Sequence, residues 1–424
     1  MKARQWWIGC TAITAITAGV LGTAYVINQQ DDYEGAAATT IAAPAGGLAA
    51  LQATPNLDTA ELTSQLAEFG GSDKLGEFSA VIRDATSGQT IYSAQPETLM
   101  LPASATKMLT SVAAILELGP GAQIETTITQ PDPTTLVINA AGDVWLDDAA
   151  LADLAAQIQA NVDLSTITTV EIRNTVWQVE EFNSGWDEAD IAGGYIAPMQ
   201  PAMLYGARQE GTTGDLPRTT TPMAEVASNL ANTLGLPEAE IRTLTEFTPA
   251  DEGTPVATWR SAALSERVDE MMAHSDNVMA EAIGRELSGT DPVGATLEIL
   301  GNQGLAVSGL EVSDNSGLSI DNRISPMFFA DLMDLVVSTE SLHNVILGMP
   351  VAGGTGTLET RYTTDTGKGW VRAKTGTLTG VSAMVGVVPS VEGHLYTFAL
   401  ISNEASILDA RAHMDKMLSL LREH

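Results

Sequence analysis

Cysteine is almost absent from this chain of 424 residues, which contains only Cys10. That residue lies in an apolar segment near the amino terminus, preceded by Trp-Ile-Gly, which is a poor lipidation signal. The rest of the chain therefore has no disulfide bonds and no cysteine-based zinc site. A small apolar residue inside a membrane segment is the simplest interpretation of Cys10.

Basic residues are scarce as well. Lysine and arginine together number 20 against 53 aspartates and glutamates, which gives a formal net charge of −33. Because no basic stripe is available to follow a phosphate backbone, the composition excludes nucleic acid as a partner. So large an acidic excess favours solubility outside the cell or at high salt, and it says little about the fold.

Histidine supplies no metal or catalytic pattern. The five histidines are scattered, and neither G-x-S-x-G nor H-E-x-x-H occurs in the chain. His274 adjoins a motif described below, whereas the other four show no ligand spacing. Triad residues can be distant in sequence, so a Ser-His-Asp triad stays open, although nothing points to one. We therefore predict neither a metal site nor a cofactor.

One long hydrophobic run, residues 6–27, stands at the amino terminus, with basic residues before it and acidic residues after it. Twenty-two residues can span a bilayer, and the charge asymmetry places the body of the chain outside the membrane. The nearest A-x-A-like site, at 36–38, lies far beyond the run. This favours a membrane anchor in residues 1–27 over a cleaved signal segment that would release the protein. Residues 28–55, rich in Ala, Thr and Gly, are predicted to be a flexible linker, and the body is expected in the cell envelope.

Strand patterns dominate both ends of the remaining chain. Residues 78–94 contain two short alternating runs around a turn, which predicts a hairpin. Residues 370–402 contain three further strands separated by Gly- and Pro-containing turns, and a helix is predicted over 407–421. We expect the hairpin and the last three strands to form one five-stranded antiparallel sheet covered by helices.

The middle of the chain mixes strand and helix patterns. Residues 134–146 resemble strands, whereas residues 146–161 have the periodicity of a helix. We predict that 126–254 forms a smaller α/β domain inserted into an α+β domain. That larger domain would be built from residues 56–125 and 255–424.

Three short motifs carry the chemistry. An S-x-x-K motif spans 104–107 at the start of an apolar helix, S-D-N spans 275–277 between helical segments, and K-T-G spans 374–376 at the head of a strand. A second S-D-N, at 313–315, lies in a Gly- and Ser-rich loop, so we prefer the copy between helices. Each motif alone is weak, but two of only six lysines occupy the two required positions. Together the three motifs are the signature of class A β-lactamases and penicillin-binding proteins.

The first motif pairs a nucleophile with a base. A serine hydroxyl is a weak nucleophile until a neighbouring base takes its proton. Residues three apart on a helix share a face, so Lys107 is expected to reach Ser104. To act as a base Lys107 must be neutral, and both burial and a second cation lower a lysine pKa. We expect Lys374 to be that cation, and the helix start to favour the developing negative charge.

The chain resembles the penicillin-binding D-alanyl-D-alanine carboxypeptidases, in particular the low-molecular-mass class C type of the serine β-lactamase-like superfamily. The similarity covers most of residues 56–424 and includes "LSERVDEMMAHSDNVMAEAIGREL" around the second motif. It implies a β-lactamase/transpeptidase-like domain with an insertion between the first two motifs. In "SDNSGLSIDNRISP", Asn315 stands where glycine is more usual, so we assign that stretch only a part in shaping the cleft. The "TGTL" at 355 lacks a preceding lysine and is expected to be structural.

This resemblance implies a serine DD-carboxypeptidase, which removes the terminal D-alanine from peptidoglycan stem peptides ending in D-Ala-D-Ala. Ser104 would attack the penultimate carbonyl and become acylated, with Lys107 as the base. Ser275 and Asn277 would relay protons and hold the substrate amide. Lys374 completes the expected catalytic set, and β-lactam antibiotics would be covalent inhibitors.

The family pattern also implies how the substrate is held. Thr375, Gly376 and Thr377 are the expected substrate-binding residues. Lys374 with the two threonines would bind the terminal carboxylate, which is a charge-assisted contact. The backbone N–H groups of Ser104 and Thr377 would form the oxyanion hole.

Three alternatives stay open. The second motif follows the first by 171 residues, more than in compact β-lactamases, and no glutamate is convincingly placed for deacylation, so β-lactamase activity is the second choice. A DD-endopeptidase would use the same serine chemistry, and the sequence does not separate it from a carboxypeptidase. A non-catalytic envelope protein that retains the fold is the alternative from another class, because fold alone does not establish activity.

Overall fold

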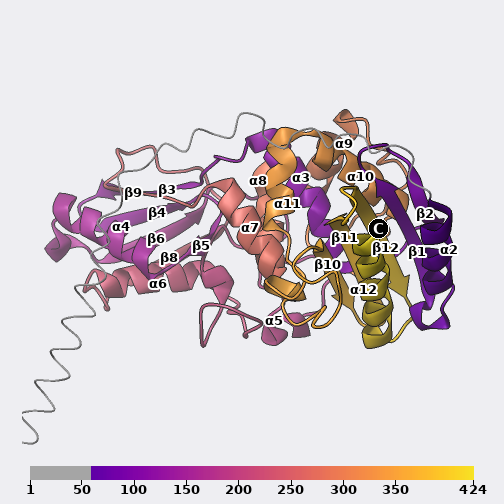
Figure 1. Ribbon diagram of the computed structural model, residues 1–424. Coiled ribbons are helices and arrows are strands. Elements are labelled where there is room, and N and C mark those ends of the chain that lie inside the picture. Colours follow the sequence, from indigo (N-terminus) through magenta and orange to yellow (C-terminus); the bar gives the residue numbers. More distant parts are fainter. Residues whose placement is uncertain (1–58) are drawn as a thin grey trace, which may run out of the picture. The chain divides into compact units, whose positions relative to one another are not determined.

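The computed structural model describes residues 59–424 (Figure 1). The predicted anchor at 1–27 and the predicted linker at 28–55 lie outside the described residues. Within the described part, no helix combines the length and the apolar composition needed to cross a membrane.

The first sheet is antiparallel and has the strand order β10-β11-β12-β1-β2. Its strands are β1 (Glu77–Asp84), β2 (Thr90–Ala94), β10 (Arg372–Leu378), β11 (Val381–Pro389) and β12 (Leu395–Asn403). Val81 of the amino-terminal hairpin pairs with Ala399 of β12, so segments from the two ends of the described chain meet in one sheet. This confirms the five-stranded antiparallel sheet that the sequence predicts.

Helices cover both faces of this sheet. Successive side chains of a strand point to opposite faces. On β11, Met384 therefore packs into a core with α2 (Thr59–Gly70) and α12 (Ile407–Glu423), whereas Val385 packs into the opposite core with α10 (Pro326–Ser338). Nearly all of β11 and β12 is buried for this reason.

More helices extend the layer on the α10 side. They are α3 (Lys107–Leu118), α7 (Leu264–His274), α8 (Asn277–Leu287), α9 (Pro292–Asn302) and α11 (His343–Gly348). The first of these, α3, is buried along most of its length and packs against α8 and α9. Because α3 begins within the first motif and α8 begins within the second, their packing brings these two motifs together.

The second sheet is mixed and has the order β8-β6-β4-β3-β9. Its strands are β3 (Glu125–Asp132), β4 (Thr135–Ala140), β6 (Thr169–Asn174), β8 (Glu240–Phe247) and β9 (Ala257–Arg260). Strands β4, β6 and β8 are parallel, and α4 (Asp148–Asn161) and α6 (Pro222–Thr233) supply the crossovers and pack on one core. We propose this sheet with its helices as the inserted unit; the predicted end at residue 254 falls between β8 and β9.

A smaller group of elements joins the insertion to α8. The short parallel strands β5 (Asp143–Leu146) and β7 (Ala202–Leu204) pair with each other, and α5 (Ala189–Gly193) precedes β7. The apolar core of this group includes Trp186 and also Val278 of α8. The 3-10 helices are η1 (Asp73–Leu75), η2 (Ala103–Thr106), η3 (Leu164–Thr166), η4 (Tyr205–Ala207), η5 (Glu340–Leu342) and η6 (Gly356–Leu358).

Candidate active site

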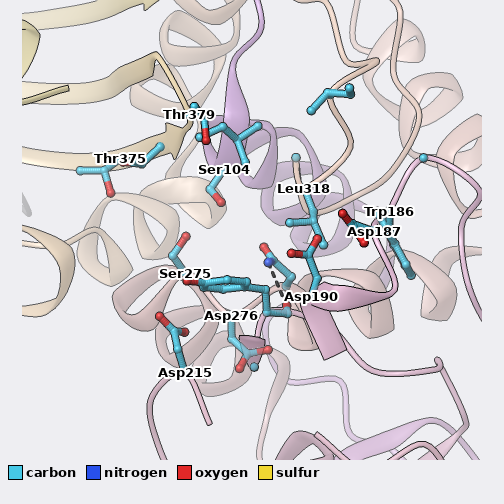
Figure 2. A pocket seen from close by; sticks show the side chains of 18 of the residues that line it. Ser104, Trp186, Asp187, Asp190, Asp215, Ser275, Asp276, Leu318, Thr375 and Thr379 are labelled. Atoms are coloured by element: carbon cyan, nitrogen blue, oxygen red, sulfur yellow. Dashed lines mark hydrogen bonds between the residues drawn. The ribbon is translucent and has the colours of Figure 1, made fainter. Parts of the chain in front are cut away.

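All three sequence motifs contribute to one cleft of about 1240 Å³ (Figure 2). Ser104 enters its lining from η2, and Ser275 and Asn277 enter it from the junction of α7 and α8. Thr375 and Thr377 line it from the edge strand β10. The structure therefore brings together residues that are up to 273 positions apart in the chain.

Lys107 links the first motif to the second. Its Nζ donates hydrogen bonds to Ser104 Oγ at 2.9 Å and to Asn277 Oδ1 at 2.6 Å. A third bond, of 2.7 Å, goes to the carbonyl oxygen of Ser316. The lysine is fully buried, whereas Ser104 faces the cleft. Lys107 is thus placed to exchange a proton with the Ser104 hydroxyl, which agrees with the contact expected from their spacing.

The backbone at Ser104 differs from the predicted α-helix. Ser104 lies in the 3-10 turn η2, and α3 begins only at Lys107. The reason is a tight turn at Ala103, whose φ of 47° lies in the left-handed region that non-glycine residues rarely adopt. Gly317 packs against this turn so closely that a Cβ there would lie 2.0 Å from the Ala103 carbonyl oxygen. The neighbouring loop therefore helps to hold the strained turn that presents Ser104.

Buried ionisable groups set the proton affinity of Lys107. Burial lowers the pKa of Lys107 to about 8, although the carboxylates of Asp314, Asp276 and Glu281 act in the opposite direction. Burial also raises the pKa of Glu281 to about 8, and the charge of Asp314 adds to this effect. A substantial fraction of Lys107 is therefore neutral near pH 8, as a general base requires.

Lys374 links the third motif to the second. Its Nζ donates hydrogen bonds to Ser275 Oγ at 2.9 Å and to the Thr375 carbonyl oxygen at 2.7 Å. Burial lowers the pKa of Lys374 well below its ordinary value, and the charge of Lys107 lowers it further. Repulsion between two ammonium groups is reciprocal, so this contact agrees with the expectation that Lys374 disfavours the charge on Lys107. Because the surrounding carboxylates also stabilise the charge on Lys107, the ammonium of Lys374 is the less stable of the two.

The second motif is a sharp junction between two helices. Ser275 ends α7 with a φ of 58°, in the left-handed region. Asp276 then caps α8 by accepting a hydrogen bond of 3.0 Å from the backbone N–H of Met279. This geometry allows Ser275 to bond to Lys374 while Asn277 bonds to Lys107.

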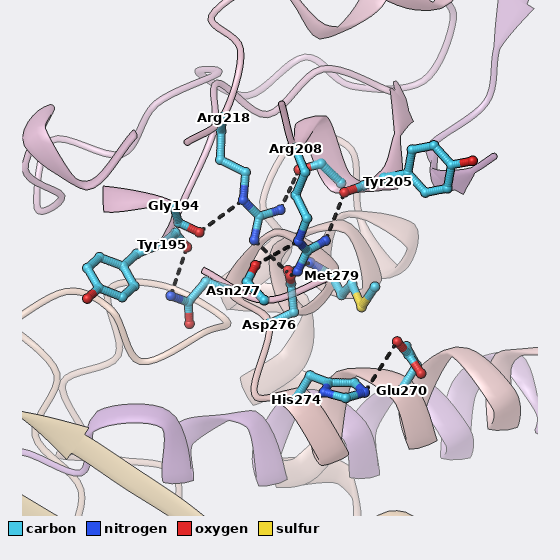
Figure 3. A network of polar contacts seen from close by, with 12 residues as sticks. Gly194, Tyr195, Tyr205, Arg208, Arg218, Glu270, His274, Asp276, Asn277 and Met279 are labelled. Atoms are coloured by element: carbon cyan, nitrogen blue, oxygen red, sulfur yellow. Dashed lines mark hydrogen bonds and ion pairs between the residues drawn. The ribbon is translucent and has the colours of Figure 1, made fainter. Parts of the chain in front are cut away.

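Asp276 also ties this junction to the insertion (Figure 3). Its buried Oδ2 accepts from Arg208 Nη2 at 2.5 Å and from Arg218 Nη2 at 2.9 Å. Burial alone would raise the pKa of Asp276, but Arg218 and Arg208 more than offset this effect and hold the pKa at about 2. Arg218 further donates to the Gly194 carbonyl, and Asn277 Nδ2 donates to the Tyr195 carbonyl at 2.9 Å. Asp276 therefore does more than shape the turn expected from its sequence, because it also holds an ion-pair network.

Asp276→Asn is expected to destabilise the protein by about 3–5 kcal/mol, because it leaves two buried guanidinium groups without their shared carboxylate. Chemical denaturation of the purified protein measures this change. Asp321→Asn is the matched control, since Asp321 lines the same cleft but is exposed. Equal stability of both variants would contradict a structural role for the ion pairs.

Strand β10 lies directly against η2. A Cβ at Gly376 would lie 2.3 Å from the carbonyl oxygen of Pro102, so only glycine permits this approach. Thr375 Oγ1 lies 2.7 Å from Thr357 Oγ1 and forms a hydrogen bond with it, while Thr377 faces the cleft. Thr357 belongs to the "TGTL" segment at 355, which is expected from the sequence to be structural. In the structure it also lines the cleft beside the third motif.

The loop at 313–322, which contains the second S-D-N triplet, contacts Lys107 and helps to hold it in place. Asp314 accepts hydrogen bonds from the backbone N–H groups of Gly317 and Ser319 and from the indole N–H of Trp186. Ser316 in turn accepts from Lys107 through its carbonyl oxygen. Ser316 could not be predicted from the sequence, because a backbone acceptor leaves no residue-type signal.

The wall across the cleft from Thr375 is acidic. Figure 2 shows Asp187 and Asp190 near Trp186 on that side, whereas Asp215 lies below Ser275. Burial raises the pKa of Asp190, and the charge of Asp187 adds to this shift. Among residues 59–424, no cluster of three or more His, Cys, Asp or Glu side chains has the arrangement of a metal site.

Comparison with known proteins identifies the family. The sequence pattern of the D-Ala-D-Ala carboxypeptidase 3 (S13) family matches residues 62–231 and 217–424. Carboxypeptidase DacB of Mycolicibacterium smegmatis is 36% identical over 389 residues, which cover 85% of this chain and 84% of that protein. A carboxypeptidase of Mycobacterium tuberculosis is 34% identical over 398 residues, which cover 87% of this chain and 85% of that protein.

The fold is shared with penicillin binding protein 4 of Haemophilus influenzae. The TM-score is 0.68 at 20% identity, with 87% of this chain and 98% of that chain covered. A structure of that protein in complex with a β-lactam also matches, at 18% identity. The likeness confirms the predicted α+β, β-lactamase/transpeptidase-like fold.

These findings define the protein first as a serine-type peptidase, a hydrolase, which is the enzyme class predicted from the motifs. Within that class, the chain belongs to the D-Ala-D-Ala carboxypeptidase 3 (S13) family. The resemblance stated in the sequence analysis is thereby confirmed.

Proposed function

We propose that the protein removes the terminal D-alanine from peptidoglycan stem peptides through an acyl-enzyme on Ser104. The observation that carries this proposal is the position of the Lys107 ammonium nitrogen. It is buried and lies within hydrogen-bond distance of both Ser104 Oγ and Asn277 Oδ1. A serine with an adjoining, partly neutral lysine is the arrangement that nucleophilic acyl transfer requires.

The reaction proceeds in two steps. Lys107 Nζ accepts the hydroxyl proton while Ser104 Oγ attacks the carbonyl carbon of the penultimate D-alanine. The backbone N–H groups of Ser104 and Thr377 stabilise the resulting oxyanion. The peptide bond then breaks as Ser275, bonded to Lys374, relays a proton to the leaving amine. Water attacks the ester and releases the shortened stem peptide, which restores the Ser104 hydroxyl.

The third motif holds the substrate in this scheme. Thr375 and Thr377 line the cleft where the terminal carboxylate binds, and Gly376 allows their strand to approach the nucleophile turn. A β-lactam places its strained amide at the same carbonyl position. Because its leaving group stays attached to the acyl-enzyme, hydrolysis is slow and the drug inhibits the enzyme.

Benzylpenicillin is expected to add one drug mass to the protein, on the peptide that contains Ser104. Intact mass spectrometry over time, followed by digestion and peptide mapping, measures the adduct. Hydrolysed benzylpenicillin, which lacks the intact ring, is the control and should add no mass. A persistent adduct supports the carboxypeptidase, and a transient one with accumulating hydrolysed drug would move the assignment to a β-lactamase. No adduct at any time would contradict the covalent mechanism.

The same site is also a candidate for DD-endopeptidase activity, which is the cleavage of cross-links between stem peptides. Its volume of about 1240 Å³ exceeds that of most small-molecule pockets, which hold roughly 300–1,000 Å³. This favours room for a cross-linked peptide in addition to a single stem. Release of monomeric stems from a purified cross-linked dimer, compared with release of D-alanine from the monomer, measures the balance.

We also propose that the enzyme works in the cell envelope. Its substrate class is located there, and the apolar segment at 6–27 has the length and flanking charges of a membrane anchor. The acidic composition fits a body that lies outside the membrane.

A further inference from the structure

Arg411 of α12 lies beside the carboxylate-binding end of β10. It lines the cleft together with Thr377, and its Nη2 donates a hydrogen bond of 2.7 Å to Thr377 Oγ1. Its Nε is buried and has no hydrogen-bond partner within residues 59–424. Asp415, one turn further along α12, is bound by Arg361 instead. The guanidinium of Arg411 therefore has unused donors next to a threonine of the third motif.

The other cations near the cleft are already engaged. Lys107 and Lys374 are fully buried, and both bond to serine side chains and backbone carbonyls of the enzyme itself. Arg218 lines the cleft but is bound to Asp276. Burial and the charge of Arg361 lower the pKa of Arg411, yet an arginine remains protonated in proteins at neutral pH. Arg411 is thus the cation whose charge is available at this end of the cleft.

We propose that Arg411 binds the terminal carboxylate of the substrate, together with Thr377 and Thr375. The proposal rests on the proposed function, since this carboxylate belongs to the D-alanine that is released. The family pattern implied Lys374 as the cation, but in the structure that ammonium is enclosed between Ser275 and the Thr375 carbonyl. An arginine offers several donors in a fixed plane that matches a carboxylate, so Arg411 supplies selectivity for a free carboxyl terminus.

Three variants separate the charge of Arg411 from its bond to Thr377. Arg411→Gln keeps a donor for Thr377 without the charge, and Arg411→Lys keeps the charge. Lys416→Gln is the matched control, because Lys416 is exposed on the same helix. Each variant is assayed on a peptide ending in D-Ala-D-Ala and on the same peptide with a C-terminal amide.

We expect Arg411→Gln to lower kcat/KM for the free acid about 30-fold, equivalent to about 2 kcal/mol, mainly through KM. Cleavage of the amide should be unchanged, so the preference for the acid falls by the same factor. Arg411→Lys should retain most of that preference, and Lys416→Gln should match the wild type. An equal fall in kcat/KM for the peptide acid and for the peptide amide would show that Arg411 only positions Thr377. That result, or an unaltered Arg411→Gln, would overturn the proposal.

A carboxylate-free inhibitor distinguishes failure of this inference from failure of the proposed function. The methyl ester of benzylpenicillin lacks the carboxylate, so it should acylate Ser104 equally fast in the wild type and in Arg411→Gln. Absence of any acylation in the wild type, by the drug or by its ester, would refute the proposed function itself. Acylation at Ser104 by a wild type that cleaves acid and amide equally well would refute only the role of Arg411.

Discussion

Ser104→Ala is expected to abolish covalent labelling by benzylpenicillin and to lower turnover of a D-Ala-D-Ala peptide on the order of 10⁶-fold. The proposed reaction has no other nucleophile at the carbonyl carbon, so the acyl-enzyme cannot form. The fold should survive the change, because the only side chain bonded to this hydroxyl in the described structure is that of Lys107. Release of D-alanine and intact mass measure the two effects.

The matched control is Ser184→Ala, which removes an exposed hydroxyl from the lining of the same cleft. It should label and turn over like the wild type, and both variants should melt at the wild-type temperature. Full labelling of Ser104→Ala by benzylpenicillin would mean that another residue is the nucleophile, and peptide mapping would identify that residue.

Lys107→Met is expected to slow acylation of Ser104 by a factor on the order of 10³–10⁴, the range for loss of a general base. Methionine approaches lysine in length and is tolerated in buried sites, so the serine should stay in place. The slower acylation should appear as a lower rate of adduct formation, which rapid mixing and mass spectrometry measure. Lys416→Met, at an exposed position, is the control for loss of one lysine charge. Wild-type acylation in Lys107→Met would exclude this lysine as the base.

The wild-type acylation rate should rise with pH through a midpoint near 8 and level off about one pH unit above it. The sign follows from the base: raising the pH removes the proton from Lys107, whose pKa burial lowers to about 8, and only the neutral amine accepts the serine proton. Glu281, whose pKa is raised to about 8, titrates in the same range, so the observed midpoint belongs to the pair. The residual rate of Lys107→Met should be flat over this range. A wild-type rate that falls with pH would contradict the neutral-lysine mechanism.

The first sheet could be predicted from sequence because its strands carry long periodic patterns bounded by turns. The pairing of most strands in the second sheet could not be predicted from such patterns. Strand β9, at Ala257–Arg260, is only four residues long, and its partner β3 lies more than 120 residues earlier in the chain. Strand β8 has an alternating burial pattern, but its place beside β6 depends on a helical crossover. Pairings of this kind are decided by tertiary packing.

The motifs predicted which serine and lysine side chains would lie together, because serine and lysine at fixed spacing are chemically specific. They did not predict the groups that act through the fold. Arg208 and Arg218 lie in a segment with loop composition, and only the tertiary structure brings them to Asp276. The motifs also did not predict the carboxylates that stabilise the charge on Lys107, because these come from separate elements, α8 and the loop at 313–322. Arg411 lies on an ordinary amphipathic helix, and only its contact with Thr377 sets it apart.

Strand β10 is the outermost strand of its sheet, so one side of its backbone has no neighbouring strand within residues 59–424. An isolated bridge between Val351 and Arg372 covers its beginning, and Thr375, Thr377 and Leu378 line the cleft. An open strand edge is a template for a further extended chain, which it recognises by main-chain hydrogen bonds. Recognition of this kind depends on backbone shape and chirality more than on side chains. We therefore expect the enzyme to tolerate variation along the stem peptide while discriminating sharply against L-alanine at either of the last two positions.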